Sequence, residues 1–152
     1  PNICLTGFPE YRAMRQLLYA SNTSRDVSQD VLDDILAASR RNNPRDGITG
    51  MLLYVEGGFM QVLEGEDAAV SAVYARIARD RRHWNSQVLL DRAAPRAFGE
   101  WSMGFERPRP GDDGIFAITR DAIGGKLKPE APREIMTLLT TFYRVNSSDR
   151  NL

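Results

Sequence analysis

The chain has 152 residues, in which 20 lysines and arginines balance 20 aspartates and glutamates. This length suits one domain with a single core, and the zero net charge leaves no overall field to attract nucleic acid or an anionic membrane. The one cysteine, Cys4, cannot form an internal disulfide or a metal site alone, and no apolar run approaches the about 18 residues of a membrane span. We therefore expect a soluble, cytoplasmic protein.

Residues 15–21 form a short apolar run that ends at a polar Asn-Thr-Ser sequence, and this pattern predicts a first β-strand. Successive side chains of a strand point to opposite faces. Leu17, Tyr19 and Ser21 are therefore expected to share one face.

An amphipathic helix is predicted after this strand. Its apolar residues recur at helical spacing, and they are Val31, Leu32, Ile35 and Leu36. Ser28 is a suitable N-cap, and Asp30 is favourable near the positive end of a helix. Pro44 disfavours helical geometry in the residue before it, so we expect the helix to end near Asn43.

A hairpin and a second helix are predicted next. An Asp-Gly pair supplies a turn, and residues 49–55 form an apolar run that leads through a Glu-Gly-Gly turn into residues 59–63. Asp67 is then a suitable N-cap for a helix that is expected to end near Arg81. Its apolar positions follow the helical pattern and are Val70, Val73, Tyr74 and Ile77.

Two short strands are predicted beyond the second helix. Residues 87–90 form the fourth strand of the chain and residues 101–105 the fifth. Trp101, Met103 and Phe105 alternate onto one side of that fifth strand. Such residues most often serve as packing in a core.

The order of these elements predicts an α+β fold, a ferredoxin-like βαββαββ sheet with two helices on one face. We expect residues 15–106 to form this domain. Residues 107–152 are expected to form a C-terminal helical extension, because residues 132–145 have amphipathic helical spacing. Right-handed crossovers place the first and third strands side by side. Tyr19 and Gln61 can then share the face toward the helices, and the other face is expected to be an exposed contact surface.

Gln61 places an amide within an otherwise apolar run. A buried amide without partners costs about 1–3 kcal/mol, so this side chain needs hydrogen bonds. Two readings stay open: backbone groups or solvent at a strand end satisfy Gln61, or it bridges Tyr19 and a ligand. Asn42 and Asn43 are likewise either cap and turn residues or contacts to a planar, uncharged, hydrogen-bonding ring.

Taken together, these residues resemble the BLUF family, the blue-light sensors that use flavin. The resemblance runs from about Leu17 to Phe105. The segments that carry it are Ala38-Ser39-Arg40-Arg41-Asn42-Asn43, Gly47-Ile48-Thr49-Gly50, Phe59-Met60-Gln61-Val62-Leu63-Glu64-Gly65, Arg79-Asp80-Arg81-Arg82-His83 and Trp101-Ser102-Met103.

The resemblance implies noncovalently bound FAD between the two helices and no metal. It makes Tyr19 and Gln61 the photoactive pair, and Asn43 the residue that holds the flavin carbonyl edge, with Asn42 beside it. The remaining implied contacts are Ile35 and Ile77 on opposite faces of the ring, and Arg76, Asp80, Arg82 and His83 toward the ribityl and phosphate side. His83 is alternatively a solvated residue in a charge-rich helix end, and as the only histidine it has no partner for a metal site or a triad.

The resemblance also implies a sensor rather than an enzyme. Excited flavin takes an electron and a proton from Tyr19, Gln61 rearranges by rotation or tautomerisation, and Trp101 or Met103 relays the change to the terminal helix. The output would pass to a separate protein, such as a cyclic-dinucleotide phosphodiesterase or a response-regulator-like protein, or would change a homo-oligomer.

Two other functions are compatible with this fold. An acylphosphatase-like hydrolase needs a phosphate loop with a paired arginine and asparagine, which is not evident in this sequence. A ferredoxin-like interaction module without photoactivity is the second alternative. An RNA-binding version of it needs aromatic residues exposed on the sheet and a basic surface, and the zero net charge argues against that version.

Overall fold

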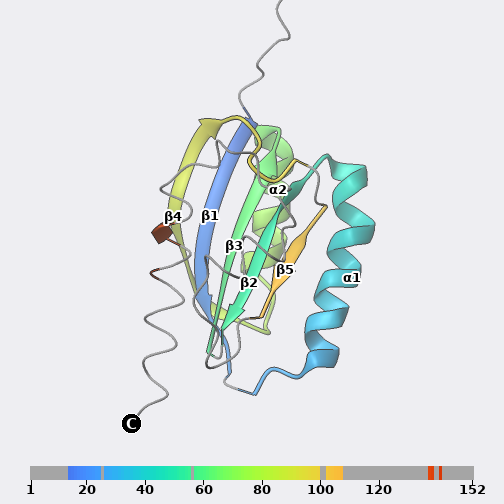
Figure 1. Ribbon diagram of the computed structural model, residues 1–152, viewed down its shortest axis with the longest axis vertical. Helices are drawn as coiled ribbons and strands as arrows, with labels where there is room; N and C mark the ends of the chain where they lie inside the picture. Colours follow the sequence, from blue (N-terminus) through green and yellow to red (C-terminus); the bar gives the residue numbers. More distant parts are fainter. Residues whose placement is uncertain are drawn as a thin grey trace, which may run out of the picture.

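The computed structural model describes residues 14–24, 26–55, 57–99 and 102–107, together with residues 137, 138 and 141. Within this part of the chain a five-stranded sheet has the strand order β4-β1-β3-β2-β5, and α1 and α2 cover one of its faces (Figure 1). The elements are β1 (Met14–Asn22), α1 (Gln29–Asp46), β2 (Thr49–Val55), β3 (Gly58–Gly65), α2 (Asp67–Ala78), β4 (Trp84–Ala94) and β5 (Gly104–Glu106). The predicted α+β, ferredoxin-like sheet is confirmed. Trp101 and most of the predicted terminal helix lie outside the described residues.

β1 and β3 form the centre of the sheet, as the crossover rule predicted. The two strands are antiparallel, and Tyr19 pairs with Gln61 in their register. β4 and β2 flank them as antiparallel neighbours, and β5 joins β2 in parallel. Two polar side chains that are far apart in the sequence are therefore adjacent on the central strands.

Apolar side chains fill both faces of the sheet. The cluster between the sheet and the helices contains Leu17, Tyr19, Leu32, Leu36, Ile48, Leu52, Tyr54, Phe59, Leu63, Val70, Val73 and Met103. The cluster on the opposite face contains Leu18, Met51, Leu53, Val55, Met60, Val62, Ala97 and Phe98, and Leu138 packs against it. The expectation that this second face is exposed is wrong. The reason lies in strands such as β2, whose consecutive apolar residues supply both clusters, as in a sheet that is covered on both sides.

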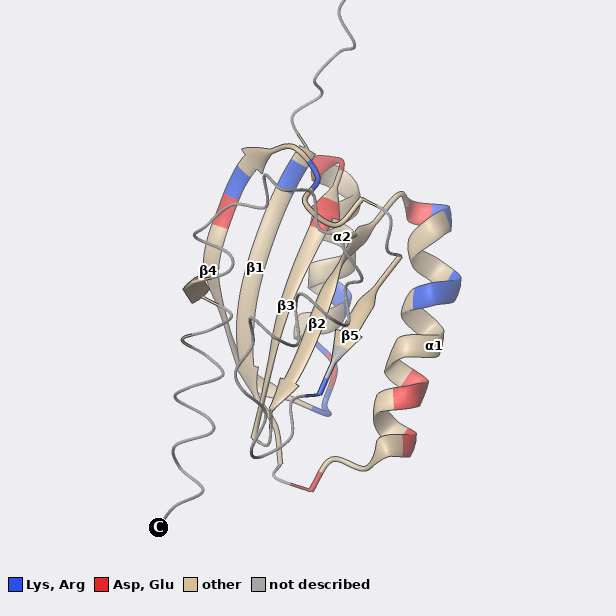
Figure 2. Ribbon diagram, viewed as in Figure 1, with Lys and Arg blue, Asp and Glu red and all other residues tan. Residues whose placement is uncertain are grey.

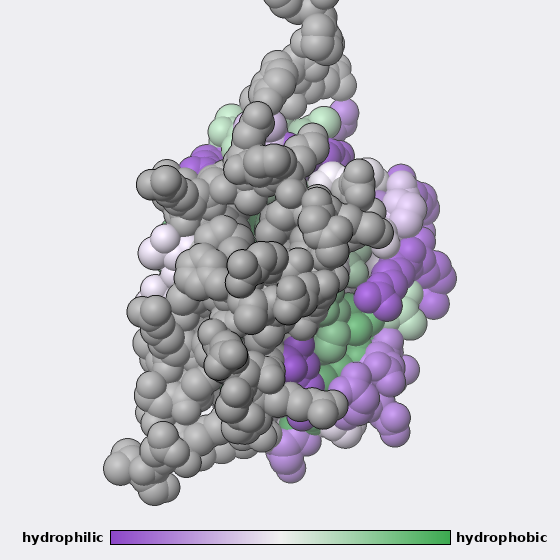
Figure 3. Space-filling view, in the orientation of Figure 1, coloured by the Kyte–Doolittle hydropathy of each residue, from purple (hydrophilic) through white to green (hydrophobic). Residues whose placement is uncertain are grey.

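The start of α1 follows the prediction. Ser28 Oγ accepts a hydrogen bond from Val31 N at 3.3 Å, so Ser28 is the N-cap. Asp30 lies in the first turn and Arg45 in the last, which complements the helix dipole. Figure 2 shows acidic residues at the start of α1 and arginines in its second half. Apolar side chains gather between α1 and the sheet, whereas the outer surface of α1 is polar (Figure 3).

The carboxyl end of α1 differs from the prediction, because the helix continues past Asn43 and through Pro44 to Asp46. A proline in the last turn removes only one backbone N–H donor, so it does not stop the helix there. The helix ends at Gly47, which has a left-handed φ of 67°. Ile48 N donates to Asn43 O at 2.9 Å and closes this end in a Schellman motif.

The bounds of α2 also differ from the prediction. Glu66, rather than Asp67, is the N-cap. Asp67 is the first helical residue, and its carboxylate accepts a hydrogen bond from Arg15 Nη1 at 2.8 Å instead of capping the helix. α2 ends at Ala78, before the expected end near Arg81. Among the described residues, no helix combines the length and hydropathy that crossing a membrane requires.

The segment from α2 to β5 contains the remaining differences. Asp80 Oδ1 accepts from Arg82 N at 2.9 Å, and this local bond forms a turn where the helix was expected to continue. β4 begins at Trp84 instead of residue 87, because it pairs with β1 along its length although polar residues interrupt its apolar pattern. β5 begins only at Gly104.

Candidate functional site

A cavity of about 220 Å³ opens between α1, α2 and the sheet face that these helices cover. Its lining residues are Tyr19, Ile35, Ala38, Ser39, Asn42, Asn43, Leu52, Phe59, Gln61, Val73, Arg76, Ile77, Asp80, Arg82 and His83. Every cofactor-contacting residue predicted from the sequence belongs to this lining. The fold therefore brings together side chains from three strands, two helices and the segment before β4.

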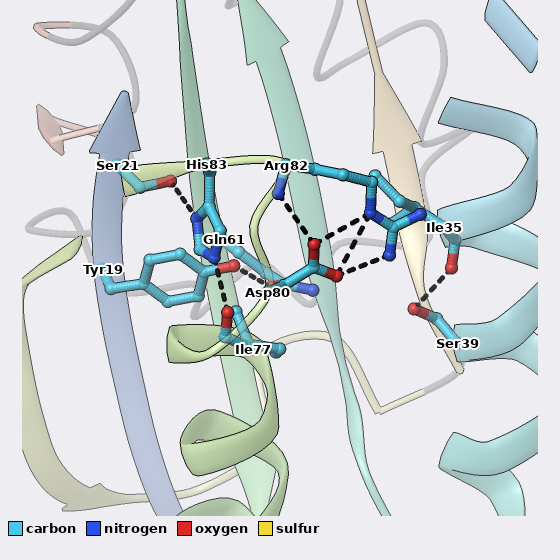
Figure 4. Close-up of polar contacts among 9 residues, drawn as sticks. All are labelled: Tyr19, Ser21, Ile35, Ser39, Gln61, Ile77, Asp80, Arg82 and His83. Atoms are coloured by element: carbon cyan, nitrogen blue, oxygen red, sulfur yellow. Dashed lines mark hydrogen bonds and ion pairs between the residues drawn. The ribbon is translucent and has the colours of Figure 1, made fainter. Parts of the chain in front are cut away.

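Tyr19 and Gln61 are bonded to each other at the sheet side of the cavity (Figure 4). Tyr19 Oη donates to Gln61 Oε1 at 2.5 Å, and both side chains are buried. Burial raises the pKa of Tyr19 far above its ordinary value, and the charges of Tyr74 and Asp80 raise it further. The phenol therefore keeps its proton and acts as the donor, which directs the oxygen of the Gln61 amide toward it.

The nitrogen of the same amide contacts Met103. Gln61 Nε2 donates to Met103 Sδ at 3.3 Å, and Met103 is only 2% exposed. Met103 O accepts from Arg40 Nε at 3.4 Å, so α1 also holds this residue. The sequence left open whether Met103 or Trp101 packs beside Gln61. In the structure Met103 does so, and Trp101 lies outside the described residues.

α1 forms one wall of the cavity. Ile35, Ser39 and Asn42 are spaced at i, i+4 and i+7, so they lie on one face of the helix. Ser39 Oγ donates to Ile35 O at 3.0 Å (Figure 4). Asn43 is buried, and its Nδ2 donates to Ser102 O at 2.6 Å. This bond ties the end of α1 to the segment that precedes β5.

His83 lies between β1 and the end of α2 (Figure 4). Its Nε2 lies 2.5 Å from Ile77 O, which can only accept, so Nε2 carries the proton. Its Nδ1 lies 2.7 Å from Ser21 Oγ and accepts that hydroxyl proton when the ring is neutral. The ring packs edge-on against Tyr19, with 6.3 Å between centroids. His83 is thus a buried, bonded residue and not a solvated one.

Charged side chains also line the cavity. Arg82 Nη2 donates to Asp80 Oδ2 at 2.5 Å, and hydrogen bonds from Arg82 hold the pKa of Asp80 below its ordinary value although partial burial opposes this shift. Arg76 Nη2 donates to Asp46 Oδ2 at 3.3 Å. Guanidinium groups present several N–H donors in a plane, a chemistry that suits anionic oxygens such as those of a phosphate.

The lining suits a flat, neutral ring with an anionic tail. Ile35 on α1 and Ile77 on α2 supply apolar contacts from two different helices. The amides of Asn42, Asn43 and Gln61 supply donors and acceptors from α1 and β3. Ligand sites commonly combine mostly apolar walls with a few placed polar groups. The residues present therefore fit a flavin nucleotide.

Some lining residues were not predicted individually. They are Ala38, Ser39, Leu52, Phe59 and Val73. Strand alternation relative to Gln61 could have indicated Phe59, and the helical spacing from Ile35 could have indicated Ser39. Ser21 was placed on the same strand face as Tyr19, but its bond to His83 depends on a distant part of the chain and left no local pattern.

The chain is similar to several known proteins. The model of the BLUF family, described as sensors of blue light using FAD, matches residues 14–104. The blue light- and temperature-regulated antirepressor BluF of Escherichia coli strain K12 is 33% identical over 88 residues, which are 57% of this chain and 22% of BluF. Photoactivated adenylate cyclase subunit beta of Euglena gracilis is 39% identical over 108 residues, which are 68% of this chain and 12% of that subunit.

A solved structure matches over almost its whole length. The dark state of BlrB, a BLUF protein, has a TM-score of 0.66 and 26% identity, and the match covers 86% of this chain and 98% of BlrB. In contrast, the chain spans less than a quarter of the length of the two curated relatives above. The family model covers more than half of the chain, and the central strands, both helices and the cavity lie within the matched residues. This chain therefore belongs to the BLUF family, the sensors of blue light using FAD.

Proposed function

We propose that this chain is a blue-light receptor that binds FAD noncovalently in the cavity between α1 and α2. The observation that carries the proposal is the continuous bond chain from Tyr19 through Gln61 to Met103 at the side of this cavity. A phenol and an amide are weak groups for hydrolysis, but together they form a hydrogen-bond chain that can exist in two arrangements. This chemistry supports the proposal of sensing rather than turnover of a substrate.

Different cavity residues would contact different parts of the cofactor. Ile35 and Ile77 would flank the isoalloxazine ring, and Gln61 and the amides of Asn42 and Asn43 would contact its polar edge. Arg76, Asp80, Arg82 and His83 would lie toward the ribityl and phosphate groups. When bound, the flavin would supply the absorption of blue light and, once excited, an acceptor for one electron.

Tyr19 and Gln61 would carry out the switch. The raised pKa of Tyr19 keeps its phenol protonated in darkness. In the proposed cycle this phenol would give up a proton together with an electron, and both would return at the end. The amide oxygen of Gln61 accepts from Tyr19, and its nitrogen donates one of its two hydrogens to Met103. Rotation of its amide would turn the nitrogen toward Tyr19 and leave Met103 Sδ, which can only accept, without its donor; tautomerisation would instead change which of the two amide atoms donates. The dark and lit states would then differ in their hydrogen bonds, as two populations of one protein.

Met103 and Trp101 are the proposed relays, and residues 107–152 the proposed output extension of a sensor domain at residues 15–106. Met103 has support from its contact with Gln61. The extension has support from Leu138, which packs against the far face of the sheet. Similar chains belong to a photoactivated adenylate cyclase and an antirepressor by name, which supports a signalling partner for this chain. We propose a cytoplasmic protein that signals to a cyclic-dinucleotide phosphodiesterase, a response-regulator-like protein or its own homo-oligomer.

An absorption spectrum of the purified, FAD-reconstituted protein tests this proposal directly. We expect a flavin spectrum in darkness that moves to longer wavelength under blue light and returns in darkness. Protein that takes up no flavin, or that takes it up without a reversible shift, would contradict the proposal and favour an interaction module. Hydrolysis of an acyl phosphate would instead support the hydrolase alternative.

A further inference from the structure

A polar row crosses one end of the sheet, outside the cavity. Arg92, Gln16, Glu64 and Thr49 are register neighbours on β4, β1, β3 and β2. Arg92 Nε donates to Gln16 Oε1 at 3.1 Å, and Gln16 Nε2 donates to Glu64 Oε2 at 2.7 Å. Glu64 has 0% exposure. The row therefore places a buried carboxylate on β3, the middle strand of the sheet.

This carboxylate holds the connection between β4 and β5. Ala97 N donates to Glu64 Oε2 at 2.7 Å, and Phe98 N donates to Glu64 Oε1 at 2.8 Å. Hydrogen bonds from N–H groups to a carboxylate are among the stronger ones in proteins. Both Ala97 and Phe98 are buried in the apolar cluster of the far sheet face. The beginning of the connection is thus attached to β3 by two backbone bonds.

A second side chain reinforces this attachment. Arg96 Nη1 donates to Thr49 Oγ1 at 2.8 Å and to Glu64 O at 3.2 Å. Arg96 Nη2 donates to Gly47 O at 2.7 Å, at the glycine that caps α1. The same short segment is therefore bound to β2, to β3 and to the end of the helix that carries Asn42 and Asn43.

The other end of the connection reaches β3 on the opposite face. There Met103 Sδ accepts from Gln61 Nε2 at 3.3 Å. Gln61 and Glu64 are three positions apart on β3, and strand alternation directs them to opposite faces. One strand thus holds the connection at both ends: at Ala97 and Phe98 through a carboxylate, and at Met103 through the amide of the proposed switch.

We infer that Glu64 is a positioning residue of the light response, and this inference rests on the proposed function. Within the connection, rearrangement of Gln61 changes only the bond at Met103. With Ala97 and Phe98 held by Glu64, the connection cannot absorb that change by sliding at its beginning. The displacement is therefore directed into β5, which follows Met103 immediately. Without the bonds from Glu64 to Ala97 and Phe98, which anchor the connection, the same rearrangement would move these two residues instead of β5.

The wild-type protein loaded with FAD provides the first test. Amide hydrogen exchange, measured in darkness and under blue light, is expected to change in residues 102–107 and to stay constant at Ala97 and Phe98. A light-induced change at Ala97 or Phe98 as large as that in residues 102–107 would overturn the inference, because an anchor does not move. A normal absorption shift without any change in residues 102–107 would also overturn it.

The variant Glu64→Gln provides the second test. It keeps the shape of the side chain but turns one acceptor oxygen into an amide nitrogen that faces a backbone N–H. We expect exchange at Ala97 and Phe98 in darkness to accelerate by about tenfold, because a strong bond to each carboxylate oxygen is disturbed. The absorption shift should keep its size. The light-induced change in amide exchange should disappear from residues 102–107 and should appear at Ala97 and Phe98.

A purely structural role predicts a different result: a lower unfolding temperature with an unchanged light–dark pattern, which would overturn the inference. Asp26→Asn, the same acid-to-amide change at an exposed position, is the control and should match the wild type. If Glu64→Gln does not fold, the wild-type exchange pattern decides alone. A wild-type protein without an absorption shift would overturn the proposed function and this inference together, whereas a normal shift with a mobile Ala97 and Phe98 would overturn only the inference.

Discussion

The phenol of Tyr19 on β1 donates to the amide oxygen of Gln61, its register partner on β3. Because the partner strands are the two central ones, neither residue can shift without disturbing the neighbouring strands. With its oxygen turned to Tyr19, the amide directs its nitrogen to Met103, whose sulfur accepts one of the two N–H groups.

Tyr19→Phe should leave FAD bound and abolish the persistent light-induced absorption shift. The substitution removes the proton and electron donor but preserves the ring that packs in the core. Difference spectra before and after illumination measure the effect. Tyr74→Phe is the matched control, because its ring lies 5.3 Å from that of Tyr19 while its hydroxyl pairs with Ser86. A Tyr19→Phe protein that cycles normally would refute the assignment of Tyr19.

Gln61→Leu should also bind FAD without a persistent shift. Leucine fills a similar volume but offers neither donor nor acceptor, so no alternative hydrogen-bond pattern exists. The tyrosine hydroxyl loses a buried partner, and we expect the free energy of unfolding to fall by about 1–3 kcal/mol. Urea unfolding measures this loss and difference spectra measure the shift. Gln87→Leu on the exposed side of β4 serves as the control. A retained shift in Gln61→Leu would show that the amide is not the switch.

Met103→Ala should keep most of the absorption shift but weaken its transmission. The truncation removes the sulfur that accepts from Gln61 and leaves a cavity, at a cost of about 2–5 kcal/mol in unfolding free energy. Hydrogen exchange of residues 137–141, compared in light and darkness, measures the transmission. Leu32→Ala is a control of similar cost, since Leu32 is buried in the cluster under the helices and not in the one against which Leu138 packs. An unchanged exchange difference in Met103→Ala would exclude Met103 as the relay.

The ion pair of Asp80 and Arg82 gives a prediction for acid pH. The folded-state pKa of Asp80 lies below its ordinary value of 3.8, so its ionised form stabilises the folded protein above that value. The contribution is lost as the pH falls through the lower, folded-state pKa. Asp80→Asn should therefore lose less stability than the wild type between neutral and strongly acidic pH, in thermal unfolding followed by circular dichroism. Asp26→Asn, at an exposed position, should behave like the wild type; identical acid profiles for Asp80→Asn and wild type would contradict this role.

Gly50→Ala should prevent correct pairing of β2 with β3. A Cβ atom at Gly50 would lie 1.9 Å from Val62 O, a backbone atom that cannot move aside. We expect a loss of at least about 3 kcal/mol of unfolding free energy, or no folded protein. Urea denaturation is the measurement. Gly99→Ala, where a Cβ meets only side-chain atoms of Arg96 at 3.6 Å or more, is the control and should remain near wild-type stability.

Sequence patterns predicted the features that depend on local periodicity. Alternation on β1 and β3, combined with crossover handedness, was sufficient to bring Tyr19 and Gln61 together. The cap at Ser28 was predicted by its own residue type. The end of α1 was not predicted correctly. Pro44 and Gly47 both indicate a helix end, and the hydrogen bond from Ile48 N to Asn43 O, which selects Gly47, forms only in the finished helix.

Features that depend on partners distant in the sequence could not be predicted in this way. Met103 and Trp101 occupy equivalent alternating positions, so no local pattern distinguishes them. The bond between Ser21 and His83 joins residues 62 positions apart. Leu138, which packs against the far sheet face, follows β5 by more than thirty residues. The network around Glu64 likewise consists of contacts between four strands.

β3 separates two packed clusters of apolar side chains, one on each face of the sheet. Gln61 and Leu63 project into the compartment below the helices, whereas Met60 and Val62 project into the one closed by Phe98 and Leu138. Close-packed interiors are barely compressible, so the cluster on the far face resists displacement of β3 toward it. Rearrangement of Gln61 is therefore accommodated on the face that the helices cover, where Met103 lies.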